Sequence, residues 1–235
     1  MAGRNRQNRE GFNAIYRYIE ISSMARYTGP KEKIERRLGE RLFLKGERSY
    51  SPKAASVKKP YPPGMHGKRA KNRKFSEYGL QLVSKQKIRV IYRLLEKQFR
   101  RYISEALKSK SDSGETLIRN LERRFDNVVF RMGFSEARDT ARQLVSHGHF
   151  LVNEKPVNIP SFKVKVGDII KIKPSNSGNR YFSSFLPRFF KKYQPPSWLD
   201  VDKETFVGRM KNLPNLTESG INHKDIQAVI EFYSR

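Results

Sequence analysis

Cationic and hydrogen-bonding side chains gather within residues 122–174. Arg138 and Arg142 are four residues apart, so on a helix their guanidinium groups share one face. Each planar guanidinium can bind two oxygens of a phosphate. The alternative is a solvated face on which both arginines pair with Glu136 and Asp139. The candidates for phosphate contacts in this stretch are Arg123, Arg138, Arg142, Gln143, His147, His149 and Asn153.

Two helices are predicted to position these side chains. Apolar residues at helical spacing predict one helix from Leu117 to Met132, ended by Gly133 in a left-handed conformation. Ser135 is predicted to cap the N-terminus of a second helix, which Gly148 ends.

A small antiparallel sheet is predicted to follow the helices. Residues 150–152 are predicted to form a strand and residues 153–155 a tight turn. Alternation of Val164, Val166, Ile170 and Ile172 around a turn at residues 167–168 predicts a hairpin. The expected unit is therefore a helix pair packed on a sheet.

Composition indicates a folded protein with a polyanionic partner. Among 235 residues, 49 lysines and arginines face 23 aspartates and glutamates, which gives a net charge of +26. The 15 phenylalanines and 11 tyrosines exclude a disordered basic tail. The absence of cysteine excludes disulfides and thiolate metal sites. No run approaches the roughly 18 apolar residues of a membrane span, so we expect no membrane partner.

The positive charge is concentrated in the N-terminal half. Residues 24–110 hold 25 basic and 7 acidic residues, whereas residues 111–173 hold 11 and 8. Residues 58–74 carry seven cations, no acid and several prolines and glycines, which predicts a loop that enters a nucleic-acid groove. The alternative is a disordered basic linker. The candidates here are Arg26, Tyr27, Lys45, Arg48, Lys58, Lys59, His66, Lys68, Arg69, Arg73, Lys85, Lys87, Arg89, Arg93 and Arg100.

Further helices are predicted on both sides of the central stretch. Ser76 is a predicted N-cap of a helix that keeps Lys85, Lys87, Arg89 and Arg93 outside. The apolar stripe of residues 99–107 assigns Phe99 and Tyr102 to a core. Residues 182–190 predict another packed helix, and a strand follows Trp198.

Catalytic and metal-binding chemistry is not indicated. Asp200, Asp202 and Glu204 share one side of an edge strand simply because the strand period is two. His147 and His149 have no third ligand in view. The sequence predicts neither an enzyme nor a metal or other cofactor.

Several ordered motifs resemble the bacterial-type family of small ribosomal subunit protein number four. They are MARYTGP from Met24, LKGER from Leu44, SPK from Ser51, PYPPGMHG from Pro60, RFDNVVFRMGF from Arg124, ARQLVSHGH from Ala141 and VIEFYSR from Val229. The resemblance spans residues 24–235. Residues 1–23 lie outside the resemblance. We expect them to be a disordered extension, or to result from a misassigned start codon, with Met24 as the true first residue.

The resemblance implies an α+β fold in which the N- and C-terminal segments form a helical domain with an inserted RNA-binding module. The expected divisions are residues 1–23, 24–114, 115–178 and 179–235. It implies a structural protein of the small subunit that binds ribosomal RNA, nucleates assembly of the subunit body and contributes to decoding accuracy. Implied partners are ribosomal protein number five and messenger RNA where it enters the ribosome. The implied location is the cytoplasmic ribosome, with an organellar ribosome as the alternative.

One departure from the family concerns zinc, which many relatives hold with four cysteines. The aligned positions here are Glu32, Glu35, Ser49 and Ala54, so we expect no zinc, and expect packing, ion pairs or RNA to hold this segment. Two other functions remain open at this stage. One is a basic protein that binds nucleic acid regardless of its architecture. The other is an accessory module of an RNA-modifying enzyme.

Overall fold

The structure is a computed structural model that describes residues 27–69 and 75–234. The expectations for residues 1–23, Arg26 and Arg73 lie outside the described residues. The helices are α2 (Lys31–Leu38), α3 (Glu47–Tyr50), α4 (Ala55–Lys58), α5 (Glu77–Ile91), α6 (Glu96–Leu107), α7 (Ser113–Glu122), α8 (Phe125–Arg131), α9 (Arg138–Ser146), α10 (Leu186–Lys192) and α11 (His223–Ser234). The strands are β1 (Phe150–Val152), β2 (Lys155–Pro156), β3 (Ile169–Ile172), β4 (Leu199–Asp202) and β5 (Val207–Met210). Short turns of helix are η1 (Gly67–Arg69), η2 (Pro174–Asn176), η3 (Tyr181–Phe185, a π-helix) and η4 (Thr217–Ser219).

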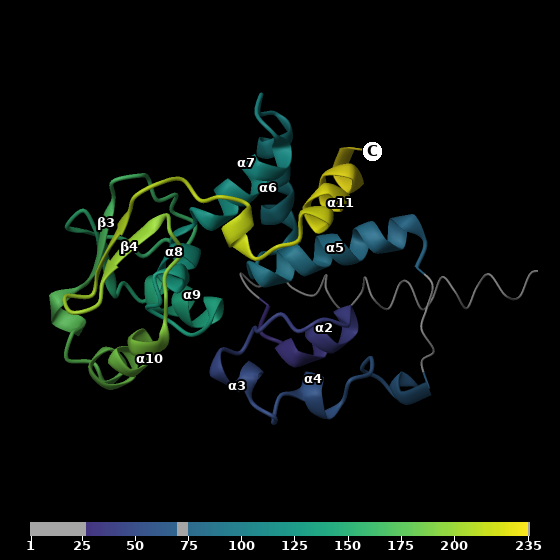
Figure 1. Ribbon diagram of the computed structural model, residues 1–235, viewed down its shortest axis with the longest axis horizontal. Coiled ribbons are helices and arrows are strands. Elements are labelled where there is room, and N and C mark those ends of the chain that lie inside the picture. Colours follow the sequence, from purple (N-terminus) through teal and green to yellow (C-terminus); the bar gives the residue numbers. More distant parts are fainter. Residues whose placement is uncertain (1–26, 70–74, 235) are drawn as a thin grey trace, which may run out of the picture.

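Four helices, α5, α6, α7 and α11, pack into a helical body (Figure 1). The Ser76 hydroxyl accepts a hydrogen bond from the Gly79 amide, which confirms the predicted N-cap of α5. Phe99 and Tyr102 are buried in the core of this body, as the helical stripe predicted. Helix α11 lies along α5, so this body brings together two segments that are more than a hundred residues apart in the sequence.

The second body is an antiparallel sheet with the strand order β2-β1-β3-β5-β4. Helices α8 and α9 lie beside the sheet (Figure 1), and their apolar faces share its core with α10. The molecule is thus α+β, as predicted. Residues 179–235 were expected to complete the helical domain. They instead contribute β4, β5 and the buried side chains of Trp198 and Met210 to the sheet body. Within this segment α11 is the helix that joins the helical body.

The predicted single helix from Leu117 to Met132 is wrong. Helix α7 ends at Glu122, and α8 begins at Phe125 after Arg124 adopts an extended conformation with ψ 136°. The first amides of α8, those of Phe125 and Asp126, donate to the carbonyls of residues 162 and 160. Both helices keep apolar residues at the same spacing, so the periodicity could not reveal that they belong to different cores.

The N-cap prediction for α9 is also wrong. Ala137 holds the N-cap position, and the Ser135 side chain is fully buried and donates to the Ala137 carbonyl. Gly133 and Gly148 do end their helices with φ of 84° and 71°, as predicted.

The hairpin prediction is partly corrected. Residues 150–152 form β1, as predicted, and the tight turn to β2 places Asn153 and Glu154 at φ 48° and 66°. Val164 is buried, but Val166 is 51% exposed and neither lies in a strand. Of the predicted hairpin, only residues 169–172 form a strand, β3, which pairs with β1.

The N-terminal helices α2, α3 and α4 form a separate layer below α5 (Figure 1). Their small core contains Ile34 and Leu44, and Val90 of α5 closes it. Throughout the described residues, no helix combines the length and the apolar character needed to cross a membrane.

Candidate nucleic-acid interface

The basic loop of residues 58–69 is an ordered surface. The Arg36 guanidinium fixes it, because Nε donates to the carbonyls of Lys59 and Tyr61 at 2.9 and 3.0 Å. The same guanidinium lies 4.9 Å from the centre of the Tyr61 ring. Gly67 is required there, since a Cβ would lie 2.0 Å from the Pro62 carbonyl oxygen. These contacts favour an ordered loop over a linker for residues 58–69, and residues 70–74 of the predicted loop lie outside the described residues.

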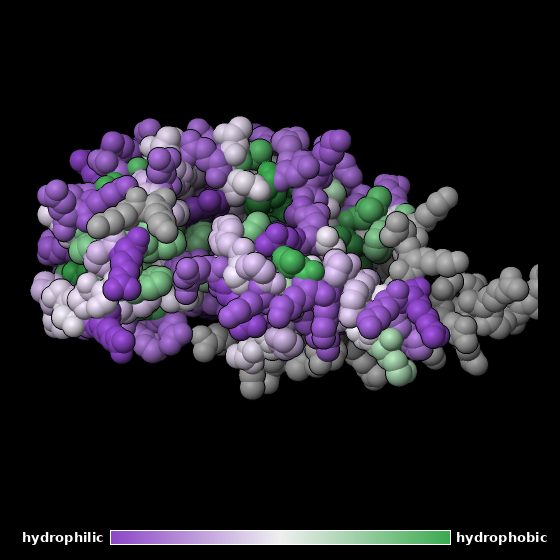
Figure 2. Space-filling model, turned by 60° about the horizontal axis from the view of Figure 1, so that its bottom comes forward, coloured by the Kyte–Doolittle hydropathy of each residue, from purple (hydrophilic) through white to green (hydrophobic). Residues whose placement is uncertain are grey.

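This loop presents cations to solvent. Lys58, Lys59, His66, Lys68 and Arg69 are all exposed, and within residues 27–69 and 75–234 no carboxylate pairs with them. Figure 2 turns the lower edge of Figure 1 forward and shows that hydrophilic residues cover most of this side. Because Arg36 already holds the backbone that carries these side chains, binding of phosphates would require little ordering of the backbone.

The cations of α5 do not lie outside, which corrects the sequence prediction. Lys85 and Arg89 are buried, and Glu96 pairs with both at 2.7 and 3.2 Å. Burial lowers the pKa of Arg89, and the opposing charge of Glu96 compensates in part. These two cations neutralise a carboxylate of α6 and are not available to RNA.

Lys87 and Arg93 are likewise used within the protein. Lys87 Nζ lies 2.7 Å from a carboxylate oxygen of Asp225 and 2.6 Å from one of Glu40. Burial acts to lower the pKa of Lys87, but hydrogen bonds to both carboxylates outweigh it, so the pKa is raised. Arg93 pairs with Asp139 at 2.7 Å and donates to the Tyr27 carbonyl at 3.1 Å.

A buried polar network joins the helical body to the sheet body. The Glu122 carboxylate is 1% exposed and accepts hydrogen bonds from Tyr92 at 2.6 Å, Asn127 at 2.7 Å and Arg131 at 2.9 Å. A second Arg131 nitrogen also bonds Glu122 at 2.9 Å and donates to the Ser219 carbonyl at 2.7 Å. Burial acts to raise the pKa of Glu122, but the charge and hydrogen bonds of Arg131 lower it.

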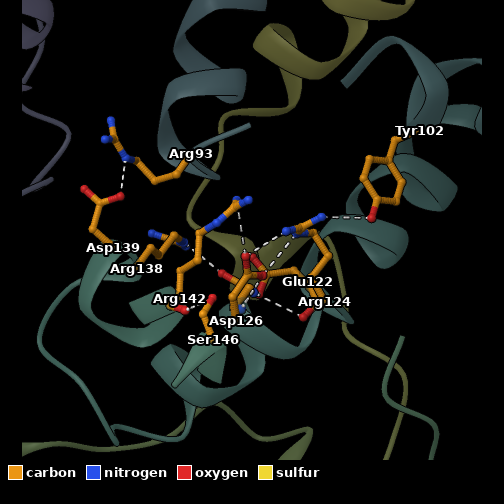
Figure 3. Close-up of polar contacts among 10 residues, drawn as sticks. Arg93, Tyr102, Glu122, Arg124, Asp126, Arg138, Asp139, Arg142 and Ser146 are labelled. Carbon is orange, nitrogen blue, oxygen red and sulfur yellow. Dashed lines mark hydrogen bonds and ion pairs between the residues drawn. The ribbon is translucent and has the colours of Figure 1, made fainter. Parts of the chain in front are cut away.

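Asp126 is the second acceptor of this network. Arg124 is 1% exposed and donates to both oxygens of Asp126 at 3.1 and 2.7 Å, and to the Tyr102 hydroxyl at 2.9 Å. Figure 3 shows Glu122, Asp126 and the surrounding guanidinium groups converging at the junction of the helices. The relative orientation of the two bodies is therefore set by charge-assisted hydrogen bonds.

Arg138 and Arg142 point into this network, which corrects their assignment as a free phosphate-binding pair. Arg138 Nε donates to Asn127 Oδ1 at 2.8 Å, and its guanidinium lies 4.4 Å from the centre of the Phe130 ring. Burial, followed by the nearby charge of Arg131, lowers the pKa of Arg138. Arg142 lies 3.8 Å from Asp126.

The alternative pairing of these arginines with Glu136 and Asp139 is also not observed. Asp139 pairs with Lys31 and Arg93, and Glu136 accepts a hydrogen bond from the Glu47 amide at 3.2 Å.

The remaining candidates of the central stretch divide between surface and structural positions. Gln143 and His147 are exposed on and after α9. His149 lies against Phe182 with a ring distance of 5.6 Å, and burial, followed by the charge of His147, lowers its pKa. Asn153 is exposed but fixes the β1–β2 turn through its side chain. Its Nδ2 donates to the Asp168 carboxylate, and its Oδ1 accepts from the backbone amide of Ile169.

Arg123 is a structural residue of the same kind. Its Nε donates to the Val164 carbonyl at 2.9 Å, and the Val164 amide donates back to the Arg123 carbonyl at 2.9 Å. The side chain thus helps to hold the loop before β3 against the end of α7.

The four positions aligned with family zinc ligands are held by the protein itself. Glu35 is buried and accepts the Leu44 amide at 3.0 Å, and the Ser49 hydroxyl accepts the Lys45 amide at 3.0 Å. Glu32 lies 3.4 Å from Arg48 and 3.9 Å from Lys45. Ala54 is 2% exposed. Packing, hydrogen bonds and ion pairs therefore hold this segment. Among the described residues, no group of three or more His, Cys, Asp or Glu side chains is arranged to hold a metal ion.

Some exposed cations were not selected from the sequence. On α6, Lys97 and Arg101 lie beside the predicted Arg100 on the solvent face, and Arg41 and Lys53 flank α3. The exposure of Lys97 and Arg101 could have been predicted from the apolar stripe of α6, because a helix that buries Phe99 and its neighbours must expose the opposite face.

Comparison with known protein families divides the chain at the break between α7 and α8. Residues 26–122 match the family described as ribosomal protein S4/S9 N-terminal domain, and residues 123–170 match the S4 domain. The junction between the two matches coincides with the break between α7 and α8.

Curated relatives match over most of the chain. Proteins named small ribosomal subunit protein uS4 from Caldicellulosiruptor saccharolyticus and Thermosipho melanesiensis are each 47% identical over 212 residues, which is 90% of this chain and 100% of each relative. The protein of that name from Heliobacterium modesticaldum is 46% identical over the same length. The chain belongs to the uS4 family of small ribosomal subunit proteins.

Proposed function

We propose that this chain is a structural, non-enzymatic constituent of the small ribosomal subunit that binds its ribosomal RNA directly. The observation that carries the proposal is the ordered loop of residues 58–69, which displays five exposed cationic or ionisable side chains that pair with no carboxylate among the described residues. The family membership and the net charge of +26 supply the class of partner.

RNA architecture is the feature that such a protein would recognise. The basic loop, the exposed face of α6 and the α9 surface at Gln143 and His147 lie on different elements. The buried network links α8 to the helical body, and Asp139 of α9 pairs with Lys31 of α2 and with Arg93. Rigid separated cations suit a folded RNA junction, because structured RNA is read through shape, phosphates and 2′-hydroxyls. Early binding at such a junction would nucleate assembly of the subunit body.

The finer roles follow from the same proposal. We infer contact with ribosomal protein number five, contact with messenger RNA where it enters the ribosome, a contribution to decoding accuracy and a location in the ribosome. We also infer two functional parts divided near Arg123 rather than near residue 115, because Leu117 and Leu121 pack in the helical core.

Binding across a salt series tests the proposal. The wild-type protein is titrated with small-subunit ribosomal RNA and with an unrelated RNA of equal length and structure content. A triple variant replaces Lys58, Lys59 and Lys68 with glutamine. Its matched control replaces Lys110, Lys173 and Lys224, which are also exposed lysines, with glutamine.

The loop variant is expected to bind ribosomal RNA more weakly. The slope of log affinity against log salt should fall in magnitude by about 2–3, since each of the three lost phosphate contacts removes about 0.7–0.9. The control is expected to bind like the wild type. A wild-type protein that binds both RNAs equally at every salt concentration would overturn the proposal in favour of architecture-independent binding.

A further inference from the structure

Two exposed aromatic rings form a stack beside the basic surface. The rings of Phe43 and Tyr50 have centroids 4.8 Å apart and an interplanar angle of 22°. Phe43 is 43% exposed and Tyr50 is 71% exposed. The Arg41 guanidinium lies 5.5 Å from the centre of the Phe43 ring. An aromatic pair this exposed contributes little to a core, because most of the Tyr50 surface stays in water.

The backbone beneath the Phe43–Tyr50 stack is held in place. Arg41 Nη2 donates to the Ser49 carbonyl at 2.6 Å, which ties the two ends of the loop together. The Leu44 amide donates to the buried Glu35, and the Lys45 amide donates to the Ser49 hydroxyl, both at 3.0 Å. The bonds at the positions aligned with zinc ligands therefore fix the segment that carries both rings.

Phe43 also adopts an unfavourable conformation. Its φ of 52° lies in the left-handed region, which a bulky residue occupies only at a steric cost. Strained residues persist where the surrounding structure imposes them, and they cluster at ligand sites. In this strained conformation the Phe43 ring remains partly exposed to solvent, so burial of the ring does not explain the strain.

The charge around the stack favours an RNA base over an apolar protein surface as its ligand. Residues 41–53 contain four cations and one acid, and Arg41, Arg48 and Lys53 among these cations are exposed. An unpaired nucleobase brings a π-face for the ring and a phosphate for a neighbouring cation, a combination used by proteins that bind single-stranded segments.

We propose that the Phe43–Tyr50 stack is a binding site for one unpaired nucleobase of ribosomal RNA, which stacks on the exposed ring of Tyr50. This inference rests on the proposed function. It adds a contact with a looped-out or terminal base to the phosphate contacts of residues 58–69.

Leucine and phenylalanine substitutions separate stacking from apolar contact. Full-length Tyr50→Leu, Phe43→Leu and Tyr50→Phe proteins are titrated with small-subunit ribosomal RNA across a salt series. Thermal melting monitored by circular dichroism checks that each variant is folded. Base-specific chemical modification of the bound RNA identifies the nucleotides that each protein protects.

Tyr50→Leu is expected to weaken binding about 5- to 100-fold, as the loss of one base–aromatic stack does, with no change in the salt slope. Phe43→Leu removes the supporting ring and is expected to weaken binding in the same direction. Tyr50→Phe keeps the ring and is expected to bind within about twofold of the wild type. Protection of an unpaired base should disappear with Tyr50→Leu and persist with Tyr50→Phe.

Failure of this inference differs from failure of the proposed function. If the wild type prefers ribosomal RNA but Tyr50→Leu keeps full affinity and the same protections, the stacking site is refuted and the proposed function stands. If the wild type shows no preference for ribosomal RNA, the proposed function fails and the stacking site fails with it.

Discussion

Replacing Glu122 with glutamine tests whether the buried network holds the two bodies together. The substitution keeps the size of the side chain but removes the charge opposite Arg131. Glu122 accepts hydrogen bonds on both carboxylate oxygens, including two from Arg131 at 2.9 Å. The new amide would present N–H groups to donors and leave a largely buried guanidinium unpaired.

The expected loss of stability is large. Removing one partner of a buried ion pair costs about 3–5 kcal/mol. For a chain of this size, a change of about 1 kcal/mol shifts the melting temperature by about 2–4 °C. We therefore expect Glu122→Gln to melt about 6–20 °C below the wild type.

The control is Glu115→Gln, because Glu115 is 41% exposed and pairs with Arg119 at 2.7 Å on the surface of α7. A surface pair contributes about 0–1 kcal/mol, so this variant should melt within a few degrees of the wild type. Melting is followed by circular dichroism at neutral pH. If Glu122→Gln melts no lower than Glu115→Gln, the network does not stabilise the junction and this reasoning is refuted.

Two other predictions follow from the same network. The pKa of Glu122 is lowered in the folded protein, so its contribution to stability is present above the unfolded pKa of about 4.3 and is lost as pH falls through the folded pKa. Urea titrations should show that the difference in free energy of unfolding between wild type and Glu122→Gln becomes smaller below about pH 4.5. A constant difference down to pH 2 would contradict a lowered pKa of Glu122. If Arg138 and Arg142 were the free phosphate-binding pair indicated by the sequence, replacing both with glutamine would weaken RNA binding at nearly intact thermal stability. The structure instead predicts a lower melting temperature, by about 3–12 °C, because a buried hydrogen bond from a charged group contributes about 1.5–3 kcal/mol; unchanged melting with weakened RNA binding would restore the original assignment.

Residues close in sequence were the ones whose structure could be predicted well. Ser76, Gly133 and Gly148 mark helix ends in the structure as they did in the sequence, because capping depends on a few neighbouring residues. The stripe on α6 and the strand β1 were predicted for the same reason.

Errors arose where the outcome depended on distant residues. The helix predicted from Leu117 to Met132 is broken because the carbonyls of residues 160 and 162 bind the first amides of α8. Strands β4 and β5 join the sheet through β3, a partner that no local pattern identifies. The prediction that Lys85, Lys87, Arg89 and Arg93 lie outside was wrong, because their acidic partners at residues 40, 96, 139 and 225 are distant from them or could not be identified from the local pattern.

The sequence by itself determined the α+β class, the excess of positive charge and the family to which the chain belongs. These properties depend on composition, on the spacing of apolar residues and on ordered motifs, none of which requires knowledge of contacts. Only the tertiary structure decided which cations remain available to RNA. Lys58 and Lys85 are the same residue type. Lys58 lies on an ordered loop and pairs with no carboxylate in the part of the chain that the structure describes, whereas Lys85 is buried against Glu96. A side chain is free or neutralised according to what the fold places beside it.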